Sequence, residues 1–149
     1  MFPQFTNSAA GDDCYGAVFA LHERLFRAHI EQIWGWHEAW QRQNFLSNWK
    51  ECDTRVIESR GELIGYIQTQ QSSDHILLKN IGLLPSHQSK GIGYSLVKDL
   101  QDRAADLCLP IRLSVFITNP EAQRFYERMG FMNESRTSEF QHMSWSKPA

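Results

Sequence analysis

The sequence of 149 residues is poor in cysteine, has no long apolar run and carries no large excess of either charge sign. Its cysteines, Cys14, Cys52 and Cys108, are far apart and form no Cys-x-x-Cys pair. This spacing argues against a disulfide framework or a cysteine zinc site and fits a reducing compartment. No apolar stretch approaches the length that spans a bilayer. The formal net charge of −2 provides no broad basic surface for nucleic acid or an anionic membrane.

The opening segment, MFPQFTNSAAGDD, has neither the basic region nor the apolar region of a secretory signal. We therefore expect a soluble, cytoplasmic protein. No repeat, low-complexity tract or linker divides the sequence, and its length is that of one compact domain. Hydrophobic residues make up 42% and charged residues 21% of the chain, which is ordinary for a globular protein. We predict one domain over residues 1–149.

Apolar residues recur at helical spacing in four segments. The first helix is predicted over residues 11–34, capped by Asp12 or Asp13, and the second over residues 36–50. A third runs from Gly91 to Leu107, with Leu107 facing inward and Cys108 in the core. The fourth is predicted after the Asn119-Pro120 pair, a favoured helix start, and ends at Gly130.

Strand patterns fill the segments between these helices. The predicted strands are residues 2–7, a hairpin of 54–59 with 63–70, then 75–84, 111–117 and two strands within 131–145. Strands mixed with helices in this way predict an α/β sheet of six or seven strands.

A glycine-containing loop, QSKGIGYS (residues 88–95), lies where a predicted strand ends and a helix begins. The first N–H groups of a helix lack internal partners and carry the positive end of its dipole, so a phosphate or pyrophosphate is a natural occupant. A dinucleotide fingerprint is excluded because Leu96 stands where the third glycine belongs, and no P-loop run is present. Taken alone, the loop fits a simple strand-to-helix turn equally well.

Two segments around this loop resemble signature motifs of one family. IGLLPSHQSKGIGYSL (residues 81–96) resembles motif A of the GCN5-related N-acetyltransferase (GNAT) family, where a strand ends in Pro and Q/R-x-x-G-x-G/A opens a helix. NPEAQRFYERMGF (residues 119–131) resembles the second signature of that family. The resemblance covers nearly the whole chain. It implies an α/β (α+β) fold with a central mixed, mostly antiparallel sheet of six or seven strands and about four helices.

The resemblance also implies acetyl-CoA as co-substrate. The backbone of Ile81, Gly82 and Leu83 would pair with the pantetheine arm as an added strand does, and Asn119 would lie near that arm. The positions implied at the pyrophosphate are Gln88, Ser89, Lys90, Gly91, Ile92, Gly93 and Tyr94. Lys90 would add a compact positive charge there, although it also fits a solvated loop lysine, and Asn119 also fits a helix cap.

Tyr126 matches the tyrosine that protonates the departing thiolate in many relatives, and it also fits a core-facing residue. The reaction also requires a general base, because an amine acceptor must lose a proton before it attacks. The position that is acidic in some relatives is Ser114 here. This departure argues against a direct carboxylate base and leaves a water chain, Glu38, His37 and His75 as candidates.

The segment WGWHEAW (residues 34–40) offers Trp36 and Glu38 as a candidate pocket for an amine, since a carboxylate beside aromatic rings attracts a cation. Packing between helices explains the same residues equally well. HEAWQ has Gln41 where a zinc-protease helix needs its second histidine, and we predict no metal. The segment SEFQHMSW (residues 138–145) is a candidate edge hairpin for pairing with a second copy of the chain.

These observations predict an N-acetyltransferase that moves an acetyl group from acetyl-CoA to a primary amine by direct attack in a ternary complex. Two alternatives remain open. A peptide or protein N-terminal acetyltransferase predicts an open groove on the acceptor side. A catalytically inactive coenzyme A-binding sensor predicts binding without turnover.

Overall fold

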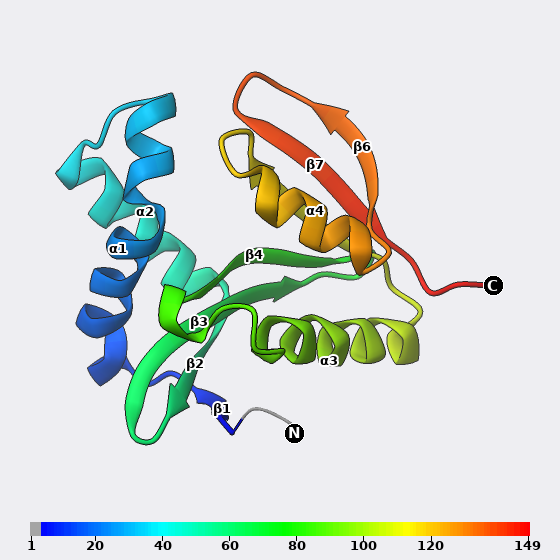
Figure 1. Cartoon of the computed structure of the whole chain (residues 1–149), viewed down its shortest axis with the longest axis horizontal. Coiled ribbons are helices and arrows are strands. Elements are labelled where there is room, and N and C mark those ends of the chain that lie inside the picture. The colour runs from blue at the N-terminus through cyan, green and yellow to red at the C-terminus, as the bar shows by residue number, and fades with distance from the viewer. Residues whose placement is uncertain (1–3) are drawn as a thin grey trace.

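The computed structural model describes residues 4–149, so Phe2 and Pro3 of the predicted first strand lie outside the described residues. Seven strands form one sheet in the order β1-β2-β3-β4-β5-β7-β6 (Figure 1). The strands are β1 (Thr6–Ala9), β2 (Asp53–Ser59), β3 (Glu62–Gln71), β4 (Ile76–Leu83), β5 (Ile111–Phe116), β6 (Met132–Arg136) and β7 (Phe140–Trp145). The α-helices are α1 (Tyr15–Ile33), α2 (Glu38–Glu51), α3 (Ile92–Leu107) and α4 (Pro120–Arg128). The predicted fold class is confirmed.

All neighbouring strands run antiparallel except β4 and β5, which are parallel. This parallel pairing is short, running from Ile76 opposite Ile111 to Leu78 opposite Leu113. Beyond these residues the two strands separate, while β4 remains paired with β3 and β5 with β7. Figure 1 shows β6 and β7 directed away from β2–β4, so the sheet opens between β4 and β5.

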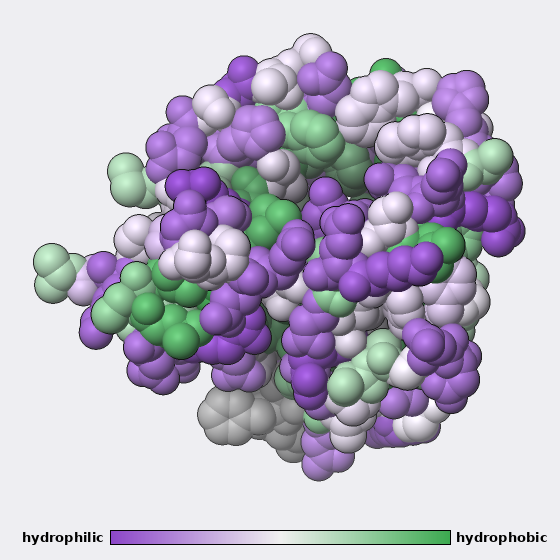
Figure 2. Space-filling view, turned by 180° about the vertical axis from the view of Figure 1, so that it is seen from behind, coloured by the Kyte–Doolittle hydropathy of each residue, from purple (hydrophilic) through white to green (hydrophobic). Residues whose placement is uncertain are grey.

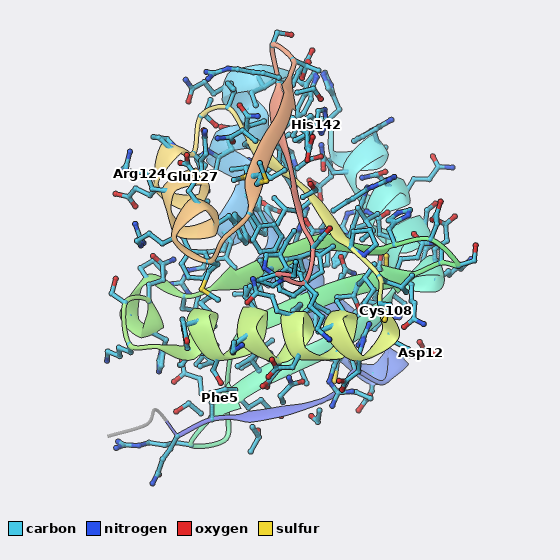
Figure 3. All side chains as sticks on the ribbon, turned by 90° about the vertical axis from the view of Figure 1, so that its right-hand side faces the viewer. Phe5, Asp12, Cys108, Arg124, Glu127 and His142 are labelled. Atoms are coloured by element: carbon cyan, nitrogen blue, oxygen red, sulfur yellow. The ribbon has the colours of Figure 1, made fainter. Side chains whose placement is uncertain are left out.

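The two faces of the sheet carry different helices. On one face, His22 and Phe26 of α1 contact the ring of Tyr66 in β3, and Phe26 also contacts Phe116 in β5. Figure 3 shows α4 on the other side of β7. Because side chains alternate along a strand, Ser114 and Phe116 of β5 face α1, whereas Leu113 is buried on the face of α4.

The start of α1 differs from the prediction. A short 3₁₀ helix, Asp12–Cys14, precedes α1, and Cys14 at the cap position makes no side-chain capping bond. Asp12 instead accepts a hydrogen bond from the Trp49 indole nitrogen at 3.2 Å, which ties the chain to α2. The predicted aspartate cap is therefore wrong, because a tertiary contact takes the carboxylate that a local cap would use.

The end of α3 is also more exposed than predicted. Leu107 is 45% exposed and Cys108 is exposed, so neither belongs to the core. Cys108 adopts a left-handed conformation with φ 56°, which ends the helix and turns the chain toward β5. The apolar spacing identified the inward face of α3 correctly through Leu100 and Ala104 but extended it one turn too far.

The surface is mostly hydrophilic in the view from behind, and one hydrophobic patch lies on the side where α3 ends (Figure 2). Within residues 4–149, no helix is both long and apolar enough to cross a membrane. The segment of residues 138–145 is not an edge, because β7 lies between β5 and β6. The edge strand at this end of the sheet is β6, which lies outside that segment, so the prediction that residues 138–145 form an edge hairpin is wrong.

Candidate active site

The opening between β4 and β5 leaves backbone groups of both strands without strand partners. The N–H of Leu84 donates to Ile64 in β3 at 2.8 Å. Because successive peptide groups point to opposite edges of a strand, the backbone groups of Leu83 and Ile81 point toward the opening, and those of Gly82 point toward β3. Two of the three residues predicted to pair with a pantetheine arm therefore present backbone groups to the opening.

Glycine at position 82 is explained by the packing of α1 against β4. A Cβ atom at this position would lie 2.6 Å from Cδ1 of Leu25 and 3.2 Å from the ring of Phe26, both in α1. The 2.6 Å approach is shorter than real Cβ contacts, so an alanine here would require the end of the Leu25 side chain to move and the Phe26 ring to shift, and glycine lets α1 pack closely on β4 without these changes.

The loop after β4 presents a row of free backbone donors. Among residues 4–149, the N–H groups from Ser89 to Tyr94 find no hydrogen-bond partner, and the cap residue of α3, Gly91, provides no side-chain bond. Lys90 is exposed beside them. Free amides at the positive end of a 16-residue helix, with a lysine alongside, match the chemistry of a phosphate-bearing ligand.

Gln88, the first of the predicted pyrophosphate residues, stabilises the loop through two hydrogen bonds. Its amide nitrogen donates to the carbonyl of Leu83 at 2.8 Å, and its backbone N–H donates to Pro85. The side chain thus fixes the loop against the end of β4. Ser89 adopts φ 60° and Gly91 φ 87°, so the turn needs two residues in the left-handed region.

Gly93 differs from Gly91. Its φ lies outside the left-handed region, and an added Cβ would stand 3.7 Å from the Phe125 ring, an ordinary contact. Neither backbone geometry nor packing requires glycine at this position. The adjoining Ile92 is buried and anchors the first turn of α3, while Tyr94 is 56% exposed.

Tyr126 is buried in α4, with 7% of the residue exposed, and its ring packs against Phe125 and Phe131. Its hydroxyl has no hydrogen-bond partner, yet among the described residues no fully buried side-chain oxygen is left unpaired. The hydroxyl oxygen must therefore reach the molecular surface. Burial raises the pKa of Tyr126 above its usual value, so the phenol keeps its proton at neutral pH and can act as a proton donor.

Asn119 is a helix cap. Its side-chain oxygen accepts a hydrogen bond from the N–H of Ala122 at 3.2 Å, and Pro120 follows as the first residue of α4. This use leaves the side-chain amide nitrogen free to donate.

Trp36 and Glu38 lie together but are already engaged. The Trp36 indole nitrogen donates to Glu38 at 2.6 Å, and Arg42 pairs with the same carboxylate at 2.8 Å. The pKa of Glu38 is lowered mainly by the indole hydrogen bond, and Arg42 lowers it further. The guanidinium of Arg27 lies 5.0 Å from the Trp36 ring centre. The chain's own cations thus occupy the positions predicted for an amine.

Three side chains are predicted as candidates for the base. Glu38 is already bound by Trp36 and Arg42. His75 hydrogen-bonds Asp74 at 2.7 Å in the turn between β3 and β4, at the end of β4 away from the glycine loop. His37 is the cap residue of α2. None of them lies on β4 or β5, the strands that border the opening.

Sequence reasoning missed a polar pair beside the opening. Ser114 of β5 lies opposite His142 of β7, and the Ser114 hydroxyl is 2.7 Å from Nδ1 of His142. They line a cavity of about 560 Å³ together with Leu77, Pro110, Arg112, Leu113, Glu134 and Ser144. No local motif links residues 28 apart, and only the strand order β5-β7-β6 brings them together.

A second polar group stands across the opening. Asn80 of β4 donates to the Gln68 side chain at 2.8 Å, and Gln68 donates to Thr54 at 3.1 Å. Gln68 is fully buried, so this chain of bonds fixes the Asn80 amide and leaves its oxygen free to accept. No cluster of three or more His, Cys, Asp or Glu side chains suited to a metal occurs among residues 4–149.

Residues 17–131 match the acetyltransferase (GNAT) family. The match covers more than half of the sequence and includes both motifs, so the chain belongs to this family of acetyltransferases. The glycine loop and Tyr126 lie within the matched segment.

One similar curated protein is the spore coat polysaccharide biosynthesis protein SpsD of Bacillus subtilis (strain 168), 29% identical over 98 residues. That alignment covers 65% of this chain and 33% of SpsD, so the match spans about a third of that protein. Among solved structures, PaiA N-acetyltransferase from Thermoplasma acidophilum, in complex with coenzyme A, has a TM-score of 0.79 and 16% identity, covering 97% and 100% of the two chains. Spermidine N-acetyltransferase from Vibrio cholerae, with coenzyme A and spermine, has a TM-score of 0.69 and 21% identity, covering 96% and 95%. These structures share the fold.

Proposed function

We propose that this protein transfers an acetyl group from acetyl-CoA to a primary amine. The observation that carries the proposal is the adjacency of two sets of free backbone groups. One set belongs to the opened edge of β4, and the other consists of the N–H groups from Ser89 to Tyr94 at the start of α3. A coenzyme with an amide-bearing arm and a pyrophosphate matches both sets at once.

In this proposal the backbone of Ile81, together with the Leu83 carbonyl that also accepts from Gln88, binds the amides of the arm, and Gly82 keeps α1 close to the strand. The pyrophosphate lies against the amides of the loop, near the charge of Lys90. Gln88 holds the loop on the carbonyl of Leu83. The amide nitrogen of Asn119, left free by its capping bond, donates to the arm. The remaining loop residues bind the pyrophosphate through their backbone N–H groups; these residues are Ser89, Gly91, Ile92, Gly93 and Tyr94.

The amine attacks the thioester carbon directly in a ternary complex. The new C–N bond forms as the C–S bond breaks, and Tyr126 gives its proton to the departing sulfur. The free N–H of Leu83 points toward the opening, where it polarises the thioester carbonyl. Holding both reactants between the two separated strands removes much of the entropic barrier to their encounter.

The acceptor remains open between a small amine and the N-terminus of a peptide. The cavity beside Ser114 and His142 lies on the face of β5 that carries Ser114, which favours entry of the acceptor from that face. The inactive sensor is the less favoured reading, because Tyr126 keeps a protonated hydroxyl at the surface with no structural partner.

The first test is isothermal titration with acetyl-CoA, on the natural protein and on a Gly91→Glu, Gly93→Glu double variant. We expect binding by the natural protein and none by the folded double variant. Thiol release is then measured with a panel of spermidine, glucosamine, free amino acids and a short peptide with a free N-terminus. A folded natural protein that does not bind acetyl-CoA refutes the proposal, and binding without thiol release favours the sensor.

A further inference from the structure

The proposed reaction requires a proton acceptor, because an alkylammonium ion has no lone pair with which to attack. The strands that border the opening provide no carboxylate. Beyond the residues that pair β4 with β5, β4 continues with Lys79 and Asn80, and β5 continues with Ser114. Glu38 is bound by Trp36 and Arg42. The group that takes the proton therefore has to come from another element.

We propose that His142 is the catalytic base that takes this proton, with Ser114 holding its ring in place. This inference rests on the proposed function. His142 and Ser114 are directly opposite in the antiparallel β5–β7 ladder, with 2.7 Å between the Ser114 hydroxyl and Nδ1. The pairing of β4 and β5 ends at Leu113, so Ser114 is the first residue of β5 beside the opening. The pair stands where the separated strands would hold the thioester.

The two proton-transfer groups lie on opposite faces of the sheet. Tyr126 belongs to α4, and Figure 3 shows α4, marked by Arg124 and Glu127, on one side of β7 and His142 on the other. This separation is compatible with direct attack on a thioester. The amine approaches the carbonyl on the face of His142, and the sulfur receives its proton from the face of Tyr126.

The surroundings of His142 leave one ring nitrogen available. Nδ1 contacts Ser114, while Nε2 has no partner among the described residues. The ring is half-buried beside Phe140, with 6.1 Å between ring centres. The charged side chains on the same cavity are Arg112 and Glu134, and Glu134 already accepts a hydrogen bond from Ser144. When Nδ1–H donates to Ser114, Nε2 carries the lone pair and acts as the base.

Neutral His142 takes one proton from the ammonium group and later releases it to solvent. The freed lone pair forms the C–N bond, the C–S bond breaks, and the electron pair goes to sulfur. Tyr126 protonates the sulfur and regains a proton from solvent, and the nitrogen releases its second proton to solvent. Imidazole suits this role, because it is the side chain that ordinarily gains and loses a proton between pH 5 and 8.

The test is a His142→Gln variant, assayed with the panel amine that gives the fastest thiol release in the natural protein. We expect kcat at pH 7 to fall by about 100-fold. The affinity for acetyl-CoA, measured by titration, should change less than about twofold, because the groups proposed to bind the coenzyme are backbone groups of β4 and of the glycine loop. In the natural protein kcat/KM should rise from an acidic limb to a plateau, whereas in the variant the plateau should be absent and the rate should keep rising with pH as free amine accumulates.

His75→Gln is the matched control, since His75 lies in the β3–β4 turn and should leave rate and pH profile unchanged. A His142→Gln protein that keeps its kcat and its acidic limb overturns the assignment while leaving the acetyltransferase proposal intact. A variant that loses acetyl-CoA binding along with its rate also overturns it, because the residue would then be structural. Failure of the natural protein to release thiol with every amine refutes the proposed function and this inference together.

Discussion

Replacing Gly91 by alanine tests whether the glycine loop is shaped for a ligand. Gly91 is the cap residue of α3 and has φ 87° and ψ −3°, a conformation that costs an L-residue about 1–2 kcal/mol. The variant should therefore lose about 1–2 kcal/mol in the free energy of unfolding, measured in urea, if the loop keeps its shape. If the loop relaxes instead, the stability loss shrinks and the amides from Ser89 to Tyr94 lose their alignment.

Relaxation of the loop should weaken binding when the loop holds a pyrophosphate, because the ligand must then restore the shape that aligns the amides. A hydrogen bond to a charged group contributes about 1.5–3 kcal/mol, so one misaligned amide should raise the Kd for acetyl-CoA by about 10- to 100-fold. Isothermal titration at constant salt measures the effect directly.

Gly93→Ala is the matched control, because this glycine is neither in the left-handed region nor crowded, with 3.7 Å from the added Cβ to the Phe125 ring. Alanine within the first turn of a helix should stabilise the protein by about 0.5–1 kcal/mol and leave the Kd within about threefold. The reasoning fails if Gly91→Ala binds acetyl-CoA as tightly as the natural protein, or if Gly93→Ala is the variant that loses binding.

Three further results follow from the structure. Tyr126→Phe should leave the free energy of unfolding within about 0.5 kcal/mol, because the hydroxyl has no partner, and should lower kcat by about 100-fold; an unchanged kcat would exclude Tyr126 as the proton donor. Gly82→Ala should cost about 1–3 kcal/mol in urea denaturation, since its Cβ would displace Cδ1 of Leu25 at 2.6 Å and press on the Phe26 ring at 3.2 Å, and a neutral effect would mean that these side chains move aside freely. Burial lowers the pKa of His22 to about 4, so the unfolded chain takes up a proton first as the pH falls. Stability should therefore be level above pH about 6.5 and fall by about 2–3 kcal/mol toward pH 4, and His22→Gln should flatten this profile.

Most of the fold follows from local signals in the sequence. The Asn119-Pro120 pair predicts the start of α4 because cap and first-turn chemistry are both local, and the structure contains that cap. The strand and helix patterns depend on apolar spacing within a few residues, which survives in the structure from β2 to β7. Errors occur where a distant residue competes, as with Trp49 taking the carboxylate of Asp12.

The coenzyme side and the acceptor side of the site differ in how well sequence predicts them. Gln88, Gly91 and their neighbours are contiguous, so a short motif marks the whole loop. The acceptor side combines residues from strands that are adjacent only in the folded sheet, as Ser114 and His142 are. Sequence reasoning selected Glu38 there, because a carboxylate beside Trp36 looks free until the positions of Arg27 and Arg42 are known.

The opening between β4 and β5 has a consequence for how this site tolerates mutation. Its binding groups are mostly main-chain amides and carbonyls, which every residue except proline supplies. Substitutions along β4 can therefore change side chains while the recognition surface persists, as long as the strand keeps its path. The Ser114–His142 pair has no such protection, since a single codon change removes it. Accumulated substitutions should consequently change which amine is acetylated, and at what rate. They should abolish binding of the acetyl donor only much later.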